Sequence, residues 1–396
     1  MPAVNLLIKP ASGLCNMHCK YCFYCDEAAR RKQASYGLMT ERTLKNVIRR
    51  SVLVASGVCT IAFQGGEPTL CGLDFFQKAV EYAQHYSRGN VELHFALQTN
   101  GTLIDEEWCR FLAENDFLVG ISVDGTRAIH DSYRQTKEGG PTYDRVLKTI
   151  QMFDRFGVEY NILTVVHREV ADNIQEIYRA YRKKRWDYLQ FITCLDPLGE
   201  ERGKQEYSLL PETYGQFLID LFDLWYEDYK QGQQPSIRQF ENYESILLGF
   251  APESCEQRGA CGIQNVVEAD GSVYPCDFYA LDAYCLGNLN TDSLQTIYDR
   301  REQMGFVERS LNHPQECKEC RWFKLCRGGC YRSRLMETEL TPAGEPLKAG
   351  EGRGTEIGKN YFCVGYRMFF EACFDRLEEV AQDTEELLLT EDPFYD

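Results

Sequence analysis

Strand-like and helix-like segments alternate strictly over the first 230 residues, which restricts the possible folds more than any other feature of the chain. Several of the strand-like runs are apolar on both faces, as is typical of a parallel sheet that helices cover on its faces. These runs cover residues 5–9, 59–64, 91–98, 117–123, 158–166 and 188–195, and the helix-like segments lie near 40–56, 73–87, 105–115, 142–156, 170–184 and 211–230. The alternation predicts an α/β fold, either a doubly wound sheet or an incomplete barrel.

Short motifs of reactive or polar residues follow the first four predicted strands. CNMHCKYC (15–22) follows the first strand and GGEP (65–68) the second, QTNG (98–101) ends the third, and SVDG (122–125) ends the fourth. Ligands and catalytic groups of parallel α/β sheets gather at the carboxyl ends of the strands. We therefore expect the four motifs to meet on one rim of the sheet.

Composition narrows the cellular setting and the classes of partner. The first residues, MPAVNLLIKP, lack the features of a secretory signal, so we expect a cytoplasmic protein whose cysteines stay reduced. No run approaches the roughly 18 apolar residues that a membrane span requires. The formal net charge of -17 argues against a nucleic-acid partner, because binding a phosphate backbone requires a basic surface.

Twelve of the 18 cysteines lie in two regions with metal-ligand spacing. In the first motif Cys15, Cys19 and Cys22 form C-x3-C-x2-C, and Cys25 follows three residues later. In the second half C-x2-C-x5-C-x3-C is accompanied by further cysteines on both sides. These eight residues are Cys255, Cys261, Cys276, Cys317, Cys320, Cys326, Cys330 and Cys363, enough for two sites of four thiolates.

Two kinds of metal site compete for these cysteines. Paired C-x2-C turns also build zinc ribbons, so zinc stays open for the second half of the chain. Zinc explains the first motif less well, because a structural zinc requires four ligands and this motif supplies three unless Cys25 joins. Three thiolates on a cluster of four irons leave one iron open for a substrate or cofactor. Cys25 as a fourth ligand would close that iron, and we disfavour this alternative.

CNMHCKYC, with the form C-x3-C-x-aromatic-C, and GGEP after the next strand resemble the signature of radical S-adenosylmethionine (SAM) enzymes. The core of that superfamily is an incomplete (β/α)6 barrel. The C-terminal cysteine pattern resembles the SPASM extension, which holds two auxiliary [4Fe-4S] clusters. More closely, the chain resembles the anaerobic sulfatase-maturating enzymes over nearly its whole length. The motifs that carry this resemblance are LLIKPAS, QGGEPTL, LQTNGTLID, FITCLDPL, WYED, DGSVYPCDFY and CRGGC.

The resemblance implies a domain organisation and a set of site residues. Residues 1–235 would form the partial barrel, 236–365 the SPASM domain with two clusters, and 366–396 a helix and an acidic tail. Cys15, Cys19 and Cys22 would hold the SAM-binding cluster. One auxiliary cluster would be held by Cys255, Cys261, Cys276 and Cys330, and the other by Cys317, Cys320, Cys326 and Cys363. The cofactor and substrate pocket would be lined by Tyr24, Gln64, Gly65, Gly66, Glu67, Gln98, Ser122, Arg134 and Leu195.

Within this pocket, the resemblance implies more specific contacts. Gly65, Gly66 and Glu67 would contact the methionine amino group of SAM, and Arg134 its carboxylate. Asp277, next to Cys276 in PCDFY, resembles the catalytic base of the family. Without the resemblance, an ordinary turn aspartate would be the simpler interpretation of that residue.

The implied reaction is the oxidation of a cysteine or serine residue in a sulfatase to Cα-formylglycine. A deoxyadenosyl radical would start it, Asp277 would accept a proton, and the auxiliary clusters would accept an electron. The cofactors would be three [4Fe-4S] clusters and SAM. The partners would be an unfolded or nascent sulfatase polypeptide and an electron donor such as flavodoxin or ferredoxin.

Two alternatives from other functional classes stay open. One is a SPASM-type enzyme that forms a thioether or a related modification in another ribosomal peptide. The other is a non-catalytic metal protein, either an electron carrier or a zinc-stapled binding module. The segment 341–360, rich in Gly and Pro, is predicted to be a mobile surface loop.

Overall fold

The computed structural model describes residues 3–87, 89, 91–334 and 358–391. Its main sheet has ten strands in the order β12-β11-β10-β1-β3-β4-β5-β7-β8-β9. The strands are β1 (Val4–Ile8), β3 (Gly57–Phe63), β4 (Val91–Thr99), β5 (Phe117–Ser122), β7 (Tyr160–Val166), β8 (Tyr188–Thr193), β9 (Ser236–Ile237), β10 (Asn265–Val267), β11 (Ser272–Tyr274) and β12 (Gly287–Asn288). A separate antiparallel ladder joins β2 (Met17–Cys19) to β6 (Arg134–Thr136).

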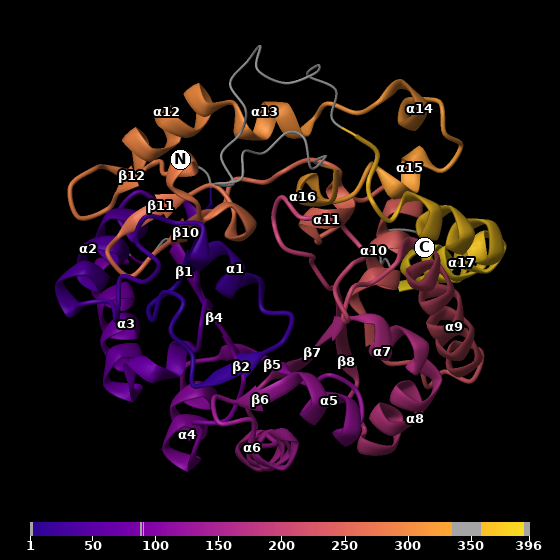
Figure 1. The fold of residues 1–396 in the computed structure, drawn as a ribbon, viewed down its shortest axis with the longest axis horizontal. Coiled ribbons are helices and arrows are strands. Elements are labelled where there is room, and N and C mark those ends of the chain that lie inside the picture. The colour runs from indigo at the N-terminus through magenta and orange to yellow at the C-terminus, as the bar shows by residue number, and fades with distance from the viewer. Residues whose placement is uncertain (1–2, 88, 90, 335–357, 392–396) are drawn as a thin grey trace.

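The six predicted strands all pair in parallel, as β1-β3-β4-β5-β7-β8. Figure 1 shows them as an arc with the connecting helices on its outer side. The predicted α/β fold with an incomplete (β/α)6 barrel is therefore confirmed. The short strand β9 continues the parallel arrangement beyond β8, whereas β10 pairs in parallel with the other edge, at β1.

The helices of the barrel are α1 (Phe23–Ala29), α2 (Glu41–Val52), α3 (Leu73–Tyr86), α4 (Glu106–Glu114), α5 (Arg127–Tyr133), α6 (Tyr143–Phe156), α7 (Arg168–Asp172), α8 (Ile174–Lys184) and α9 (Pro211–Tyr229). Local capping explains several of their ends. The Thr40 side chain accepts a hydrogen bond from the Thr43 amide at the start of α2, and Asp105 caps α4 in the same way. The predicted helix at 170–184 is wrong in one respect, because Asn173 leaves helical geometry and separates α7 from α8.

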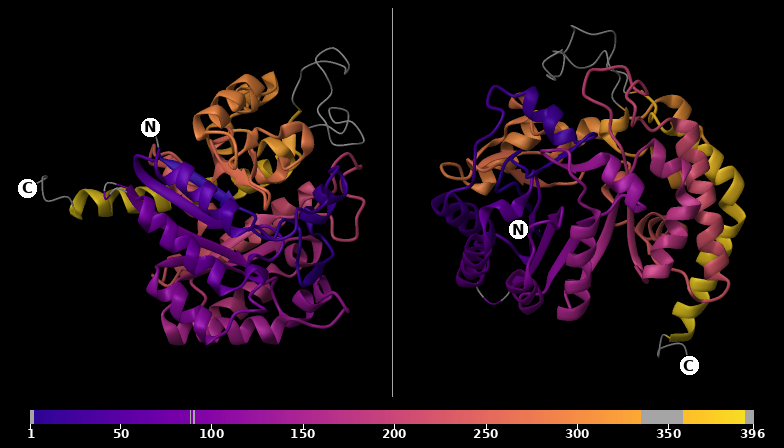
Figure 2. Two further views of the ribbon diagram at one scale, coloured as in Figure 1. Left: turned by 90° about the vertical axis from the view of Figure 1, so that its left-hand side faces the viewer. Right: turned by 60° about the horizontal axis from the view of Figure 1, so that its bottom comes forward.

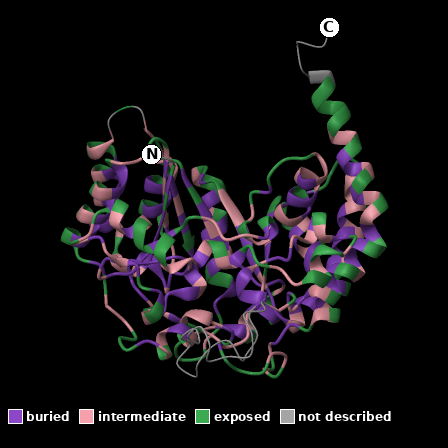
Figure 3. Ribbon diagram, turned by 90° about the horizontal axis from the view of Figure 1, so that it is seen from above, coloured by how far each residue is buried: buried purple, intermediate pink, exposed green. Residues whose placement is uncertain are grey.

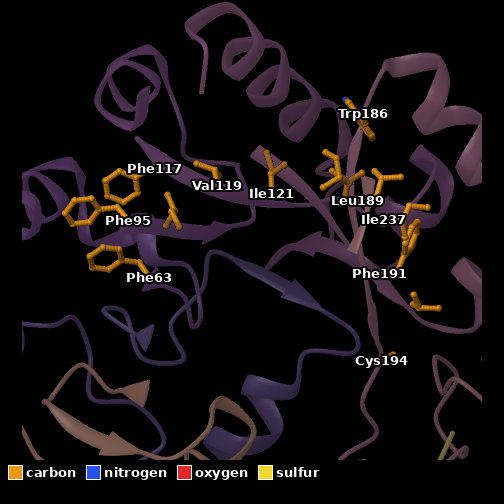
Figure 4. Packing of buried hydrophobic residues seen from close by; sticks show 14 of the residues in the cluster. Phe63, Phe95, Phe117, Val119, Ile121, Trp186, Leu189, Phe191, Cys194 and Ile237 are labelled. Atoms are coloured by element: carbon orange, nitrogen blue, oxygen red, sulfur yellow. The ribbon is translucent and has the colours of Figure 1, made fainter. Parts of the chain in front are cut away.

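Aromatic side chains fill the space between the sheet and its outer helices (Figure 4). The rings of Phe95 and Phe117 stack on neighbouring strands with centroids 5.2 Å apart, and Phe63 approaches Phe76 of α3 at 4.8 Å. All four side chains are buried. Burial of a Phe side chain contributes about 1.5–3 kcal/mol, so this layer holds the strands that carry the motifs in a fixed register.

The C-terminal part lies across one end of the arc (Figures 1 and 2). Its helices are α10 (Arg238–Leu247), α11 (Cys255–Arg258), α12 (Leu294–Met304), α13 (Phe306–Ser310), α14 (Gln315–Lys318), α15 (Phe323–Cys326), α16 (Tyr331–Arg334) and α17 (Cys363–Glu391). It also contains the short 3-10 helices η2 (Asp277–Tyr279) and η3 (Asp282–Tyr284), whereas η1 (Pro68–Cys71) belongs to the barrel. Strands β10–β12 of the predicted second domain extend the barrel sheet. The division at residues 235/236 and 365/366 stays a prediction.

Helix α17 packs along α9 (Figure 2). Glycines permit the close approach: a Cβ on Gly365 would lie 2.3 Å from the Pro211 carbonyl oxygen, and one on Gly215 would lie 2.7 Å from the Cα of Gly365. The far end of α17 projects beyond the body of the protein (Figure 3). No helix in the described part of the chain combines the length and apolar character needed to cross a membrane. Residues 341–357 of the predicted loop lie outside the described residues.

Candidate active site

The carboxyl ends of the parallel strands surround a cavity of about 380 Å³. Small-molecule sites commonly occupy about 300–1,000 Å³. All four strand-end motifs contribute to its wall, so the prediction that they meet on one rim is confirmed. The predicted site residues that line the cavity are Cys15, Cys19, Cys22, Tyr24, Gln64, Gly65, Gly66, Gln98, Ser122, Arg134, Leu195 and Asp277.

Backbone hydrogen bonds attach the GGEP loop to the loop that carries the first cysteines. The Gly66 amide donates to the Ser12 carbonyl at 2.9 Å, and the Glu67 amide donates to the Leu14 carbonyl at 2.8 Å. The two loops are so close that a Cβ on Gly66 would lie 1.9 Å from the Leu14 carbonyl oxygen. Only glycine fits there, which gives the second glycine of GGEP a structural reason.

A Gly66→Ala variant is expected to lose cofactor binding, because the added methyl group forces the cysteine loop and the GGEP loop apart. Equilibrium binding of SAM to iron-reconstituted protein measures this loss. Gly72→Ala is the matched control, since Gly72 follows the same loop and a Cβ there meets no atom within 4 Å. Alanine at Gly72 carries the strain of a positive φ of 78°, which Gly66 does not have, so binding retained by this control shows that the loss comes from the collision of the two loops. Equal binding by Gly66→Ala and the unsubstituted protein would contradict the expectation.

Glu67 does not occupy the predicted position in the cavity wall. Its side chain is fully buried and accepts four hydrogen bonds, two from Thr69, one from the Thr99 hydroxyl and one from the Asn100 amide. A carboxylate has about four acceptor sites, so these donors use its capacity. The side chain thus ties the GGEP loop to the end of β4, while the Glu67 amide donates to Leu14 and the Glu67 carbonyl accepts from the Leu70 amide.

Arg134 lies at the cavity wall within a buried polar group. Its Nη1 donates to the Tyr21 hydroxyl at 2.9 Å and lies 3.9 Å from Asp124, and the Tyr21 hydroxyl donates to Asp124. Among the described residues, Arg134 Nε has no partner. The guanidinium therefore keeps donor capacity for an anionic group in the cavity, as the predicted pairing with the SAM carboxylate requires.

Asp277 lies at the start of η2, directly after Cys276, and its side chain is buried. Oδ2 accepts hydrogen bonds from the Tyr24 hydroxyl at 2.5 Å and from Gln64 Nε2 at 3.0 Å. Oδ1 has no partner within the described part of the chain. Burial raises the pKa of Asp277, while Lys9 and the Tyr24 hydroxyl lower it. The carboxylate is thus oriented through one oxygen and free to accept a proton at the other.

A buried ionic cluster lies behind this carboxylate. Lys9 Nζ lies 3.1 Å from Glu268 Oε1 and 4.4 Å from the centre of the Tyr24 ring, and Arg31 donates to the same Glu268 oxygen at 2.6 Å. Burial alone would lower the pKa of Lys9, but neighbouring carboxylates, chiefly Glu268, raise it overall. Lys9 therefore stays charged. Its positive charge lies against the ring of Tyr24, whose hydroxyl donates a hydrogen bond to Asp277.

The three thiols of the first motif lie near one another. Cys25, in α1, is exposed, and its amide donates to the Cys22 carbonyl at 3.1 Å. All four cysteines line the cavity. The donor set of Cys15, Cys19 and Cys22 fits the predicted three-ligand cluster. Cys25 lines the same cavity as these three residues, so its role needs a test.

The other eight cysteines separate into the two predicted groups. The thiols of Cys261, Cys276 and Cys330 lie near one another, and Cys255 lies near Cys261 and Cys330. In the second group Cys317, Cys320, Cys326 and Cys363 lie near one another. Within the described residues, no three His, Cys, Asp or Glu side chains are near enough to hold one metal ion. The ligands of a four-iron cluster bind different irons and are spaced more widely, so the two groups fit clusters by donor type and number.

Sequence reasoning missed several residues of the site. Tyr21 is the aromatic residue of C-x3-C-x-aromatic-C, but no sequence pattern predicts that its hydroxyl connects Arg134 and Asp124. Asn100 belongs to QTNG and donates to Asn16 Oδ1 at 2.9 Å, with Cys15 Sγ at 3.7 Å. Arg238, which reaches the cavity from α10, has no recognisable motif around it.

Comparison with known proteins agrees with this geometry. The Radical SAM superfamily model matches residues 10–181, and the model of an iron-sulfur cluster-binding domain, SPASM, matches residues 259–321. The cysteine-type anaerobic sulfatase-maturating enzyme of Clostridium perfringens is 44% identical over 97% of this chain and 100% of its own length. The serine-type enzyme of Bacteroides thetaiotaomicron is 30% identical over 92% of this chain and 88% of its own.

A solved structure of native anSMEcpe with bound AdoMet and the Kp18Cys peptide is also similar. It superimposes with a TM-score of 0.87 at 43% identity and covers 97% of this chain and 100% of that one. Near-complete coverage at this identity extends the likeness from the barrel to the cysteine-rich part. The chain therefore belongs to the anaerobic sulfatase-maturating enzymes, within the radical SAM superfamily.

Proposed function

We propose that this protein oxidises a cysteine residue in an unfolded or nascent sulfatase polypeptide to Cα-formylglycine. The observation that carries the proposal is the unpartnered oxygen of Asp277, a residue that lines the same cavity as Cys15, Cys19 and Cys22. The choice of cysteine over serine rests on the relatives, because the cysteine-type enzyme is 44% identical and the serine-type enzyme 30%. These relatives do not favour thioether formation.

The proposed cofactors are SAM and three [4Fe-4S] clusters, held by the cysteine sets described above. When bound, these groups would supply a deoxyadenosyl radical that removes a hydrogen atom from the substrate Cβ, together with acceptors for the remaining electron. The amino-acid part of SAM would lie between the GGEP loop and Arg134, whose unpartnered Nε suits a carboxylate.

The chain's own residues would carry the proton chemistry. Tyr24 and Gln64 hold Asp277 through Oδ2, so that Oδ1 can accept the proton of the substrate thiol. Burial makes Asp277 a stronger base than an exposed aspartate, because it raises the pKa of the carboxyl. Loss of the hydrogen atom, this proton and one electron converts the thiol to a thioaldehyde. Hydrolysis then gives the aldehyde and hydrogen sulfide.

The proposal extends to the cellular setting. A flavodoxin or ferredoxin would supply the electron that starts each turnover. We place the protein in the cytoplasm, where thiols stay reduced and can bind iron. An unfolded or nascent sulfatase is also accessible there before its target residue is buried.

Anaerobic incubation of iron-reconstituted protein with SAM, a reductant and a matched pair of sulfatase peptides tests the function. The two peptides differ only in Cys or Ser at the target position, and mass spectrometry reads the product. Formylglycine is expected on the cysteine peptide, with slower or no conversion of the serine peptide. SAM cleavage with both peptides unchanged would contradict the proposed substrate, and absence of cleavage would contradict the radical chemistry itself.

A further inference from the structure

Arg334, at the end of α16, is a buried cation with no carboxylate partner among the described residues. Its side chain is 1% exposed. Nη2 donates to the Ser310 carbonyl at 2.7 Å and to the Gly259 carbonyl at 3.3 Å, and Nη1 donates to the Asn312 carbonyl at 2.9 Å and lies 3.0 Å from His313 Nδ1. Nε has no partner in the described part of the chain. A buried charge normally requires a counter-charge, and within the described residues the nearest groups that can carry negative charge are cysteine thiols.

The segments that Arg334 contacts also position one auxiliary cysteine group. Gly259 precedes Cys261 by two residues, and the Cys261 amide donates to the Ser310 hydroxyl at 2.8 Å. Arg334 itself lies one helical turn after Cys330. Its guanidinium also lies near the thiols of Cys261 and Cys330. The side chain thus lies next to two cysteines of this group and connects the loops around them.

We propose that Arg334 is the electrostatic partner of the auxiliary cluster at Cys255, Cys261, Cys276 and Cys330, and that it raises the reduction potential of that cluster. The inference rests on the proposed function, which assigns the cluster to these thiols. A [4Fe-4S] core with four thiolates is anionic and becomes more so on reduction. A neighbouring buried cation therefore stabilises the reduced form more than the oxidised form.

Other charges near this cysteine group show why Arg334 is the residue to test. Arg301 interacts with Cys276, but its donors are directed to the Gln264 carbonyl and Asn265 Oδ1. Glu256 faces Cys330 and accepts a hydrogen bond from Tyr366. A carboxylate lowers the potential, and Arg334 opposes this effect. A higher potential makes the cluster a better acceptor for the electron that the substrate loses.

The test compares Arg334→Gln and Arg334→Lys with the unsubstituted enzyme, all reconstituted with iron and sulfide. An anaerobic redox titration followed by electron paramagnetic resonance gives the midpoint of each cluster. Arg334→Gln is expected to shift the oxidised-to-reduced ratio of this auxiliary cluster at least tenfold toward oxidised, a midpoint lower by about 59 mV for one electron. Arg334→Lys, which keeps the charge, is expected to stay close to the unsubstituted protein.

Two references separate the effect of the lost charge on the midpoint from an effect of the substitution on folding. Arg50→Gln is the matched control, because Arg50 also donates to two carbonyls, those of Asp292 and Asn290, but is in α2. Arg334 also lies near Cys317 of the other auxiliary group, so that cluster cannot serve as a reference. The SAM-binding cluster is therefore the internal reference. Both references are expected to show no shift.

The outcomes distinguish this inference from the proposed function. An unchanged midpoint in Arg334→Gln overturns the electrostatic role, and so does loss of iron from the Gln and Lys variants alike, which would mark a purely structural role. Iron kept by the Lys variant and lost from the Gln variant supports a need for the charge. Fewer than three clusters in the unsubstituted protein would overturn the ligand assignment, and this inference with it, before any variant is compared.

Discussion

Asp277→Asn is expected to abolish formylglycine formation while SAM is still cleaved. Asparagine keeps the shape of the side chain and its oxygen can still accept hydrogen bonds from Tyr24 and Gln64, but an amide cannot take up the thiol proton. General-base catalysis contributes about 100- to 10,000-fold, so product formation should fall by that order. Mass spectrometry of the peptide and chromatography of deoxyadenosine measure the two results in one reaction.

Asp282→Asn is the matched control for this experiment. Asp282 belongs to η3, five residues further on, and its carboxylate accepts a hydrogen bond from the Lys32 amide at an exposed position. It should retain both activities. Because Asp277 is adjacent to a proposed ligand, Cys276, the iron content of the variant must equal that of the unsubstituted protein. Full product yield from Asp277→Asn with normal iron content would remove this residue from the role of base.

The barrel could be predicted from the sequence because its strands are long enough to show a pattern. Strands β4, β5 and β8 begin at the residues where apolar runs begin. The ladder between β2 and β6 and the strands β10–β12 were not predictable, since each has two or three residues. No periodicity can be seen over that length. Their positions depend on pairing with segments far away in the chain.

The site divides in the same way between local and distant causes. CNMHCKYC and GGEP are local motifs, and their residues lie where strand ends place them. The ionic cluster behind Asp277 could not be predicted, because Lys9 at a strand end suggests an exposed cation. Its burial depends on Glu268, which is more than 250 residues away. The grouping of the auxiliary cysteines likewise came from the family resemblance, since spacing alone would pair Cys326 with Cys330.

The largest expected loss comes from Cys22→Ala, which should eliminate SAM cleavage altogether. Removal of one of three ligands leaves Cys15 and Cys19, too few thiolates for a stable cluster. Cys25→Ala is the matched variant, because Cys25 follows at the same spacing and its amide donates to the Cys22 carbonyl. Cys25 is exposed, and the three-ligand assignment predicts that its replacement preserves the cluster and cleavage. Iron and sulfide analysis together with anaerobic cleavage assays measures both variants.

The double variant Cys22→Ala/Cys25→Ala decides whether the neighbouring thiol can act as a substitute. Cys25 lies on α1 directly after the motif, so a small movement of that helix could bring its thiol to the vacated iron. Cleavage that survives in Cys22→Ala but not in the double variant would show such a substitution. Loss of the cluster in Cys25→Ala alone would contradict the three-ligand assignment, because a cluster with four thiolates has no open iron for SAM. Retention of full activity in Cys25→Ala would establish that the fourth iron is free for the cofactor.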